Sequence, residues 1–273
     1  MDGITDPAFR AIVDEVGHPS VLYTEFVSAE GLCRNQKRLL RTFTSHKTST
    51  PLIGQLFGSD PSAMQEATAI LLEKTTVNGI DINMGCPNRR VSGHGGGAGL
   101  IKRPKVAKQL IRAVREAIKL AKKPIGISIK TRIGYEDIAT ESWITTLLEE
   151  KPEAIALHGR TLRQLYTGKA NWEEIQKAAV LASATKTLLL GNGDIQSLQE
   201  AREHIKVHTP DGVLIGRATF GNPWVFQNTV PDVKTRIEGA IRHIQLFNEL
   251  TPDANPLSLR KHLGWYVKGF PQA

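Results

Sequence analysis

The stretch Gly79–Leu100, GIDINMGCPNRRVSGHGGGAGL, joins a short apolar run to a cysteine-bearing, glycine-rich loop. Its first five residues alternate like a short strand, and Pro87 directly after Cys86 prevents a simple continuation of that strand. The glycines in the second half of the stretch leave a backbone that can approach a planar or anionic ligand closely. Two interpretations stay open from this stretch alone: a reactive site, or a glycine-rich surface loop with a buried spectator thiol.

The strand in this stretch is one of a series along the chain. Six more β-rich runs alternate with amphipathic helices, at residues 21–25, 51–56, 124–131, 154–158, 186–192 and 212–216. This alternation predicts an α/β fold with a parallel sheet covered by helices. One further strand, expected before Met1, would bring the count to the eight strands of a (β/α)8 TIM barrel. A doubly wound open sheet is the alternative, but no G-x-G-x-x-G motif follows the first strand.

Capping signals place the helix starts between these strands. Asp60 before Pro61 opens a helix that reaches about Lys74, and Asn171 and Ser197 each begin a capping box. Past residue 226 the pattern is wholly helical, at 234–250 and 257–268. We therefore expect a barrel domain over residues 1–228 and an incomplete, all-helical domain over residues 229–273. Both ends of the natural protein are expected to lie outside this chain.

Composition indicates an ordinary globular protein. The chain has 273 residues, of which 40% are hydrophobic and 23% charged, so it can bury a large core. No apolar run approaches the ~20 residues that cross a bilayer, and no secretory signal pattern is present, so a soluble protein without a membrane partner is expected. Cys33 and Cys86, the only cysteines, lie far apart, which argues against a disulfide framework or a thiolate metal site and favours a reducing cytosol.

The charge balance is basic. Lys and Arg number 35 against 27 Asp and Glu, giving a formal charge of +8 and an isoelectric point near 9.5. Such a balance favours a polyanionic partner such as nucleic acid, although a merely basic surface would look the same.

Polar residues fall where the apolar runs end. In a TIM barrel the chemistry lies at the carboxyl ends of the strands, which makes these positions candidates for a site. The residues at or just past these ends are Glu25, Gln55, Asn83, Lys130, His158, Asn192 and Arg217.

The last two strands lead into glycine-bearing segments, GNGDI (191–195) and IGRATFGNP (215–223). Loops at this point of a barrel commonly hold a phosphate group through backbone amides and a helix N-terminus. The pair therefore predicts a phosphorylated cofactor.

Three side chains suggest redox chemistry on a bound ring. Lys130 could stabilise negative charge that develops on the ring, and His158 could donate to it. The alternatives are an ion pair of Lys130 with Asp81 or Glu25, and a satisfied core imidazole at His158. Cys86 would be a proton donor or a nucleophile, and its protonation state stays open because neighbouring arginines favour the thiolate. Cys33 is expected to be structural.

With these residues in place, the chain resembles the tRNA-dihydrouridine synthase family, flavoproteins that reduce uridine in tRNA to dihydrouridine. The resemblance runs along essentially the whole chain and rests on the segments MDGITDPAFR, NMGCPNRRV, SIKTRIGY, LHGRT, NGDI, IGRA and LRKHLGWYVKG. The cysteine motif followed by GGGAGL is the most specific, since other flavin barrels share the glycine phosphate motifs.

The resemblance implies FMN as cofactor, NADPH as hydride donor and tRNA as partner, with Cys86 as general acid. It implies FMN contacts from Met1, Asp2, Gln55, Lys130, His158, Asn192, Gly193, Asp194, Gly216 and Arg217. Substrate contacts are expected from Asn83, Arg89, Arg90 and Arg160, and phosphate contacts also from Arg34, Lys37 and Arg38. No metal is expected, and we expect a monomer.

Two rival functions remain at this point. One is an FMN barrel that acts on a small pyrimidine, similar to dihydroorotate dehydrogenase, which would not need the basic helical tail. The other is a non-catalytic RNA-binding barrel, which would not hold FMN. The cysteine loop favours the tRNA enzyme over both.

Overall fold

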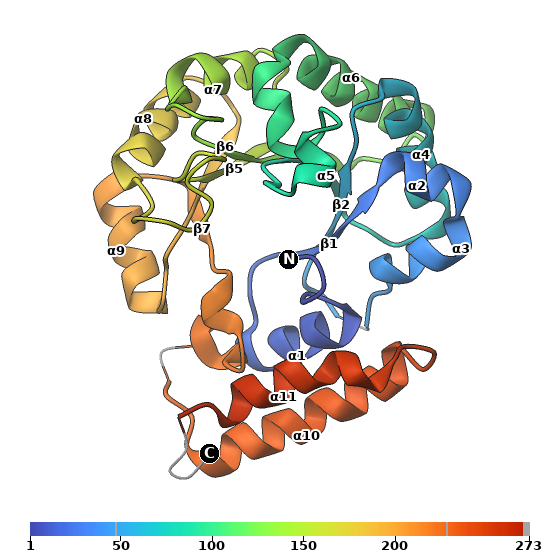
Figure 1. The fold of residues 1–273 in the computed structure, drawn as a ribbon, viewed down its shortest axis with the longest axis vertical. Coiled ribbons are helices and arrows are strands. Elements are labelled where there is room, and N and C mark those ends of the chain that lie inside the picture. Colours follow the sequence, from blue (N-terminus) through green and yellow to red (C-terminus); the bar gives the residue numbers. More distant parts are fainter. Residues whose placement is uncertain (47, 228, 270–273) are drawn as a thin grey trace.

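Seven parallel strands in chain order, each followed by helical segments, form the centre of the molecule in a computed structural model that describes residues 1–46, 48–227 and 229–269. The strands are β1 (Leu22–Ser28), β2 (Leu52–Phe57), β3 (Gly79–Met84), β4 (Gly126–Arg132), β5 (Ala154–His158), β6 (Leu188–Asn192) and β7 (Gly212–Leu214). Each strand pairs in parallel with the next, and the sheet curls around a central space (Figure 1). The α/β barrel class predicted from the sequence is confirmed, as an open barrel of seven described strands.

Helices cover the outer face of the sheet (Figure 1). The helices of the described residues are α1 (Pro7–Gly17), α2 (Ala29–Arg34), α3 (Gln36–Leu39), α4 (Pro61–Lys74), α5 (Arg89–Ser92), α6 (Pro104–Leu120), α7 (Thr140–Leu148), α8 (Trp172–Ser183), α9 (Leu198–His208), α10 (Val233–Leu250) and α11 (Arg260–Val267). Of these, α5 lies in the loop after β3, and α10 packs on α1 rather than on the sheet. Short 3-10 turns lie at Leu40–Phe43 (η1), Gly97–Lys102 (η2), Arg217–Thr219 (η3), Pro223–Phe226 (η4) and Pro256–Leu259 (η5). The main core lies between the strands and these outer helices.

The predicted helix starts at Asp60, Asn171 and Ser197 are confirmed, because each of these side chains forms its capping hydrogen bond. The side chain of Asp60 accepts from the amide of Ser62, that of Asn171 from Glu174, and that of Ser197 from Glu200. These local hydrogen bonds replace the ones that the first turn of a helix lacks.

Two strand ends differ from the prediction by more than one residue. β1 runs to Ser28, so Glu25 lies inside the strand rather than at its end. β7 already ends at Leu214, and Arg217 begins the 3-10 turn η3. Hydrogen bonds to the neighbouring strand set these ends, since Val27 and Ser28 still pair with Leu56 and Phe57 of β2.

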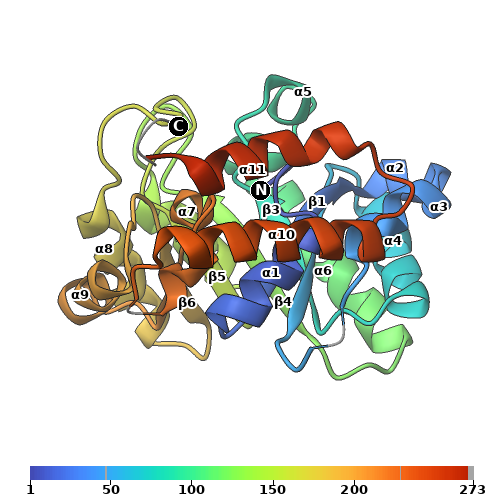
Figure 2. The ribbon, with the colours of Figure 1, turned by 90° about the horizontal axis from the view of Figure 1, so that it is seen from below.

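The C-terminal helices pack on α1. Ala8, Ala11 and Ile12 of α1 share a buried cluster with Leu246 and Phe247 of α10. Figure 2 shows α10 and α11 side by side across one side of the barrel, with α11 nearer the face that carries α5. The expected domain boundary at residue 228 lies outside the described residues, as do residues 270–273 of the expected helical domain.

Candidate functional site

The strands bring the predicted polar residues to one face of the barrel. Asn83 on β3 pairs in register with Lys130 on β4, and His158 on β5 pairs with Asn192 on β6. Because all strands are parallel, their carboxyl ends meet at one edge, and residues far apart in sequence become neighbours.

A chain of buried hydrogen bonds fixes Gln55 and Asn83. The carboxylate of Asp81 accepts from Ser128 Oγ at 2.5 Å and from Gln55 Nε2 at 2.7 Å, and Gln55 Oε1 accepts from Asn83 Nδ2 at 2.9 Å. Asp81 is completely buried, and this burial raises its pKa. Since each amide nitrogen must donate and each oxygen must accept, the chain sets the orientation of both side chains.

Asn83 also organises the cysteine loop. Its Oδ1 accepts from the backbone amides of Gly85 at 3.1 Å and Cys86 at 2.8 Å, while Ala98 N donates to Cys86 O at 3.1 Å. The glycine at 97 is required here, because its φ is +52° and an added Cβ would lie 2.9 Å from Cys86 O. Two sides of the loop therefore hold the backbone of the cysteine.

The Cys86 side chain is held as a thiol. Cys86 is only 8% exposed, and burial raises the pKa of the thiol, although Arg132 and Lys130 oppose that shift. The sequence left this state open because Arg89 and Arg90 stand nearby, but both lie exposed on or at α5. At neutral pH the group can therefore donate a proton.

Lys130 donates to Asn192 Oδ1 at 3.1 Å and forms no ion pair with Asp81 or Glu25. Burial lowers its pKa to about 8, and the charge of Arg132 adds to this shift. An ammonium has three donors, so the bond to Asn192 leaves further donors for a ligand. Glu25 is half-buried, its Oε1 has no hydrogen-bond partner among the described residues, and burial raises its pKa.

His158 is a neutral imidazole in this setting. Burial and then the charges of Lys130, Arg132 and Arg160 lower its pKa to about 2. Arg160 Nη1 lies 3.4 Å from His158 Nε2, and a guanidinium can only donate, so Nε2 accepts and the ring proton is on Nδ1. His158 can therefore offer one N–H group without carrying a charge.

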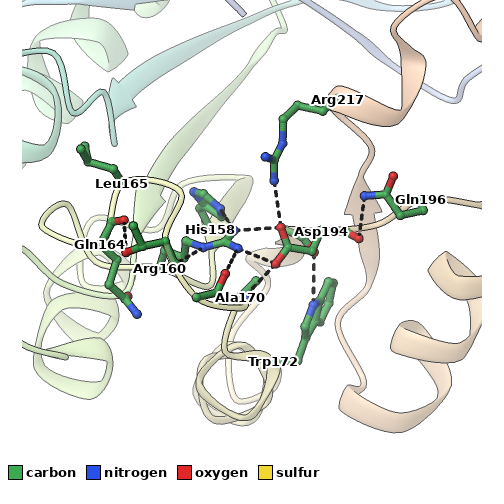
Figure 3. Close-up of polar contacts among 12 residues, drawn as sticks. His158, Arg160, Gln164, Leu165, Ala170, Trp172, Asp194, Gln196 and Arg217 are labelled. Atoms are coloured by element: carbon green, nitrogen blue, oxygen red, sulfur yellow. Dashed lines mark hydrogen bonds and ion pairs between the residues drawn. The ribbon is translucent and has the colours of Figure 1, made fainter. Parts of the chain in front are cut away.

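The carboxylate of Asp194 joins two arginines from different loops (Figure 3). Arg160 binds it through both terminal nitrogens, at 2.9 and 2.6 Å, and Arg217 Nη2 donates to Oδ1 at 2.9 Å. Arg160 is 2% exposed and also donates to Gly168 O at 2.6 Å, whereas Arg217 is half-exposed. Arg160, expected to touch substrate, thus lies buried with its guanidinium used by the protein.

The remaining predicted residues lie at the same face. A Cβ added to Gly216 would come no closer to other atoms than 3.6 Å, to Met1 Sδ, so the backbone there is open to a ligand. Gly193 has a φ of +136°, which favours glycine. Met1 and Asp2 are exposed.

Arg132 is a site residue that the sequence did not single out. It is 4% exposed and donates from Nε to Gly85 O at 2.8 Å and from Nη1 to Thr161 O at 3.0 Å. It thereby ties the cysteine loop to the loop after β5. Its place two residues after Lys130 on the same strand, pointing to the same side, was the available signal.

No helix among the described residues has both the length and the apolar character to cross a membrane.

Comparison with known proteins agrees with this geometry. Residues 1–273 match the family described as "Dihydrouridine synthase (Dus)". A probable tRNA-dihydrouridine synthase of Staphylococcus aureus (strain MRSA252) is 33% identical, over 98% of this chain and 83% of that protein. Probable tRNA-dihydrouridine synthase 2 of Bacillus subtilis (strain 168) is 32% identical, over 99% of this chain and 84% of its own length.

A solved structure shares the fold. It is that of a variant of NCR from Zymomonas mobilis, with a TM-score of 0.52 and 12% identity, and the match covers 86% of this chain and 88% of the other. This likeness concerns the fold alone. The match of residues 1–273 to the family shows that the chain belongs to the dihydrouridine synthase family, whose oxidoreductase activity the sequence motifs predicted.

Proposed function

We propose that this chain reduces uridine in tRNA to 5,6-dihydrouridine, with FMN as cofactor, NADPH as hydride donor and Cys86 as general acid. The observation that carries the proposal is the buried Cys86, kept protonated, on the barrel face that also presents Lys130 and His158. Family membership supplies the reaction.

The residues at the barrel mouth fit FMN by the chemistry of their donors. Lys130 has unused donors, His158 offers one N–H group, and the open backbone at Gly216 admits a phosphate. Gln55 keeps one amide hydrogen and one lone pair beyond its bonds to Asp81 and Asn83. When bound, FMN that NADPH has reduced supplies a hydride to C6 of the uracil.

The phosphate would be held by Arg217 and by the backbone at Asn192, Gly193 and Gly216. Asp194 carries a negative charge and its oxygens already accept from two arginines, so it would position Arg217 rather than touch the phosphate. Arg160 would support Asp194 from the buried side. Met1 and Asp2 remain proposed FMN contacts at the rim.

Cys86 would complete the reaction by giving its proton to C5 of the uracil. Asn83 holds the Cys86 amide, and so sets the direction of the thiol. Because the thiol is buried, the target uridine has to leave the folded tRNA to reach it.

We propose that tRNA is held by the rim of the barrel and by the helical residues 229–269. Exposed basic side chains lie in the segments after β1 and β3. They are Arg34, Lys37, Arg38, Arg89 and Arg90. Arg260 and Lys261 on α11 are exposed, and Lys261 Nζ donates to Gly3 O, which brings α11 to the N-terminal loop. Such charges bind phosphates through release of counterions. We propose a monomer that works in the cytosol, where its two free cysteines would stay reduced.

The test is Cys86→Ala in the FMN-loaded protein, with Cys33→Ala as the matched control. Cys86→Ala should keep the flavin spectrum and NADPH oxidation while mass spectrometry of tRNA shows no dihydrouridine. Cys33→Ala should form product normally, since Cys33 lies away from the barrel mouth with its Sγ bonded to Ala63 O. Product at the wild-type rate in Cys86→Ala would disprove the assignment.

A further inference from the structure

An open cavity lies beside the cysteine loop, with a volume of about 430 Å³. It is bounded by the glycine-rich segment after α5, the start of α6 and the loop after β4. Its lining residues are Ser92, Gly93, His94, Gly95, Gly99, Lys102, Arg103 and Tyr135. Both bounding loops follow the carboxyl ends of neighbouring strands, β3 and β4, so the cavity opens on the face that carries Cys86.

Arg103 is the group in this cavity whose charge is not compensated. It is exposed, and it has neither an ion pair nor a side-chain hydrogen bond with any residue in the described ranges. Its guanidinium lies against Gly95, where an added Cβ would collide with Nη1, and Gly95 has a φ of +82°. The glycine therefore makes room for the guanidinium, and no group in the described part of the chain uses its donors.

Lys102 and Tyr135 form the facing wall. Lys102 Nζ lies 3.9 Å from the centre of the Tyr135 ring and 3.2 Å from Glu136 Oε1. Glu136 balances one of the two cations, so the cavity keeps a net positive charge from Arg103. The cation over the ring also holds Tyr135 in place.

The cavity shares its backbone with the reactive cysteine. Ala98, whose amide donates to Cys86 O at 3.1 Å, stands between the cavity residues Gly95 and Gly99. A ligand in the cavity would therefore lie next to the loop that holds the thiol.

From these contacts we infer that the cavity binds the phosphate of a nucleotide, and that Arg103 is its main ligand. A guanidinium presents paired donors that match two phosphate oxygens, and here it does so beside an aromatic ring and a second cation. This inference rests on the proposed function. The phosphate has two possible sources of the same chemistry: the RNA strand next to the target uridine, or the dinucleotide donor.

The test compares Arg103→Gln with Arg202→Gln in the full-length, FMN-loaded protein. Arg202 is also exposed and has no side-chain partner among the described residues, but it lies on α9 on the outer side of the barrel. Both substitutions remove one positive charge, and neither removes a side-chain hydrogen bond or ion pair among the described residues. One arm measures the Kd of an unmodified tRNA transcript over a range of salt, and the other measures KM for NADPH and for NADH.

If the RNA supplies the phosphate, Arg103→Gln should weaken tRNA binding about tenfold and reduce the salt slope by about one, whereas Arg202→Gln should not. If the donor supplies it, KM for NADPH should rise about tenfold in Arg103→Gln alone, and Arg103→Lys should recover part of that loss. The inference is overturned if Arg103→Gln behaves like Arg202→Gln in both arms. A wild-type protein that makes no dihydrouridine would instead contradict the proposed function. That failure can be told apart from a failure of the inference, which shows only as equal behaviour of the two variants.

Discussion

Asn83 Oδ1 accepts the backbone amide of Cys86 at 2.8 Å, while its Nδ2 donates to Gln55 Oε1 at 2.9 Å. One buried amide thus connects the cysteine loop to the hydrogen-bonded chain inside the barrel. The position of the thiol depends on that connection.

Asn83→Ala should lower the rate of dihydrouridine formation about 10- to 100-fold, because the loss of buried hydrogen bonds frees the cysteine loop. FMN content should change little, which its absorbance measures. Asn88→Ala is the matched control, since it removes one exposed cap in the same loop. Equal rates for the two variants would contradict a positioning role for Asn83.

Cys86 should react slowly with iodoacetamide at neutral pH. Burial raises the pKa of its thiol, so the midpoint of alkylation should lie above that of a free cysteine. The measurement uses Cys33→Ala, so that Cys86 is the reporting thiol, and follows modification by mass spectrometry from pH 6 upward. A midpoint below neutral pH would show a thiolate, which cannot act as the acid.

Asp194→Asn should destabilise the protein more than Arg217→Gln. The first leaves Arg160 buried without its carboxylate, at a cost of about 3 kcal/mol, the lower end for a buried pair because Asp194 is 31% exposed. The second removes a half-exposed partner and should cost less than about 1 kcal/mol. Urea unfolding measures both.

FMN affinity tests the role proposed for Asp194 and Arg217 together at the phosphate site. Both variants should bind FMN more weakly in a fluorescence titration, because one lacks Arg217 and the other no longer holds it. Unchanged FMN affinity in both would contradict the proposed phosphate site.

Stability should fall as the pH is lowered from about 6.5, because of two buried histidines behind α1. His243 and His262 are 0% and 1% exposed with ring centres 5.0 Å apart, and Phe9 and Tyr266 contact them. Burial lowers their pKa to about 3 and about 4. The unfolded chain therefore takes up protons that the folded one refuses, so acid favours unfolding by about 2 kcal/mol per histidine between pH 6.5 and about 4.5.

Urea unfolding across this pH range tests the prediction. His243→Leu combined with His262→Leu should make the pH dependence shallower, leaving the share that the buried His158 contributes, whereas the exposed His18→Asn should leave it at the wild-type slope. The same slope in all three proteins would show that the buried pair is not its source.

Much of the fold follows from local signals. Asp60 before Pro61 fixed the start of α4, and strand β5 at Ala154–His158 was predicted to the residue, because caps and apolar runs act over a few neighbouring positions. The sequence signal for the short helices α2, α3 and α5 is weaker, since a helix of one turn has too few residues to show a hydrophobic period. Family membership also followed from the sequence, because its motifs are contiguous.

The sequence by itself determined which residues could react: one cysteine in a glycine-rich loop, one lysine and one histidine at the ends of strands. Tertiary structure alone decided their states. Burial keeps the Cys86 thiol protonated and His158 neutral, and the fold pairs the buried Arg160 with Asp194, 34 positions away. The physical reason is that charge state depends on desolvation and on neighbours in space, and only the folding of the sheet and its loops sets both.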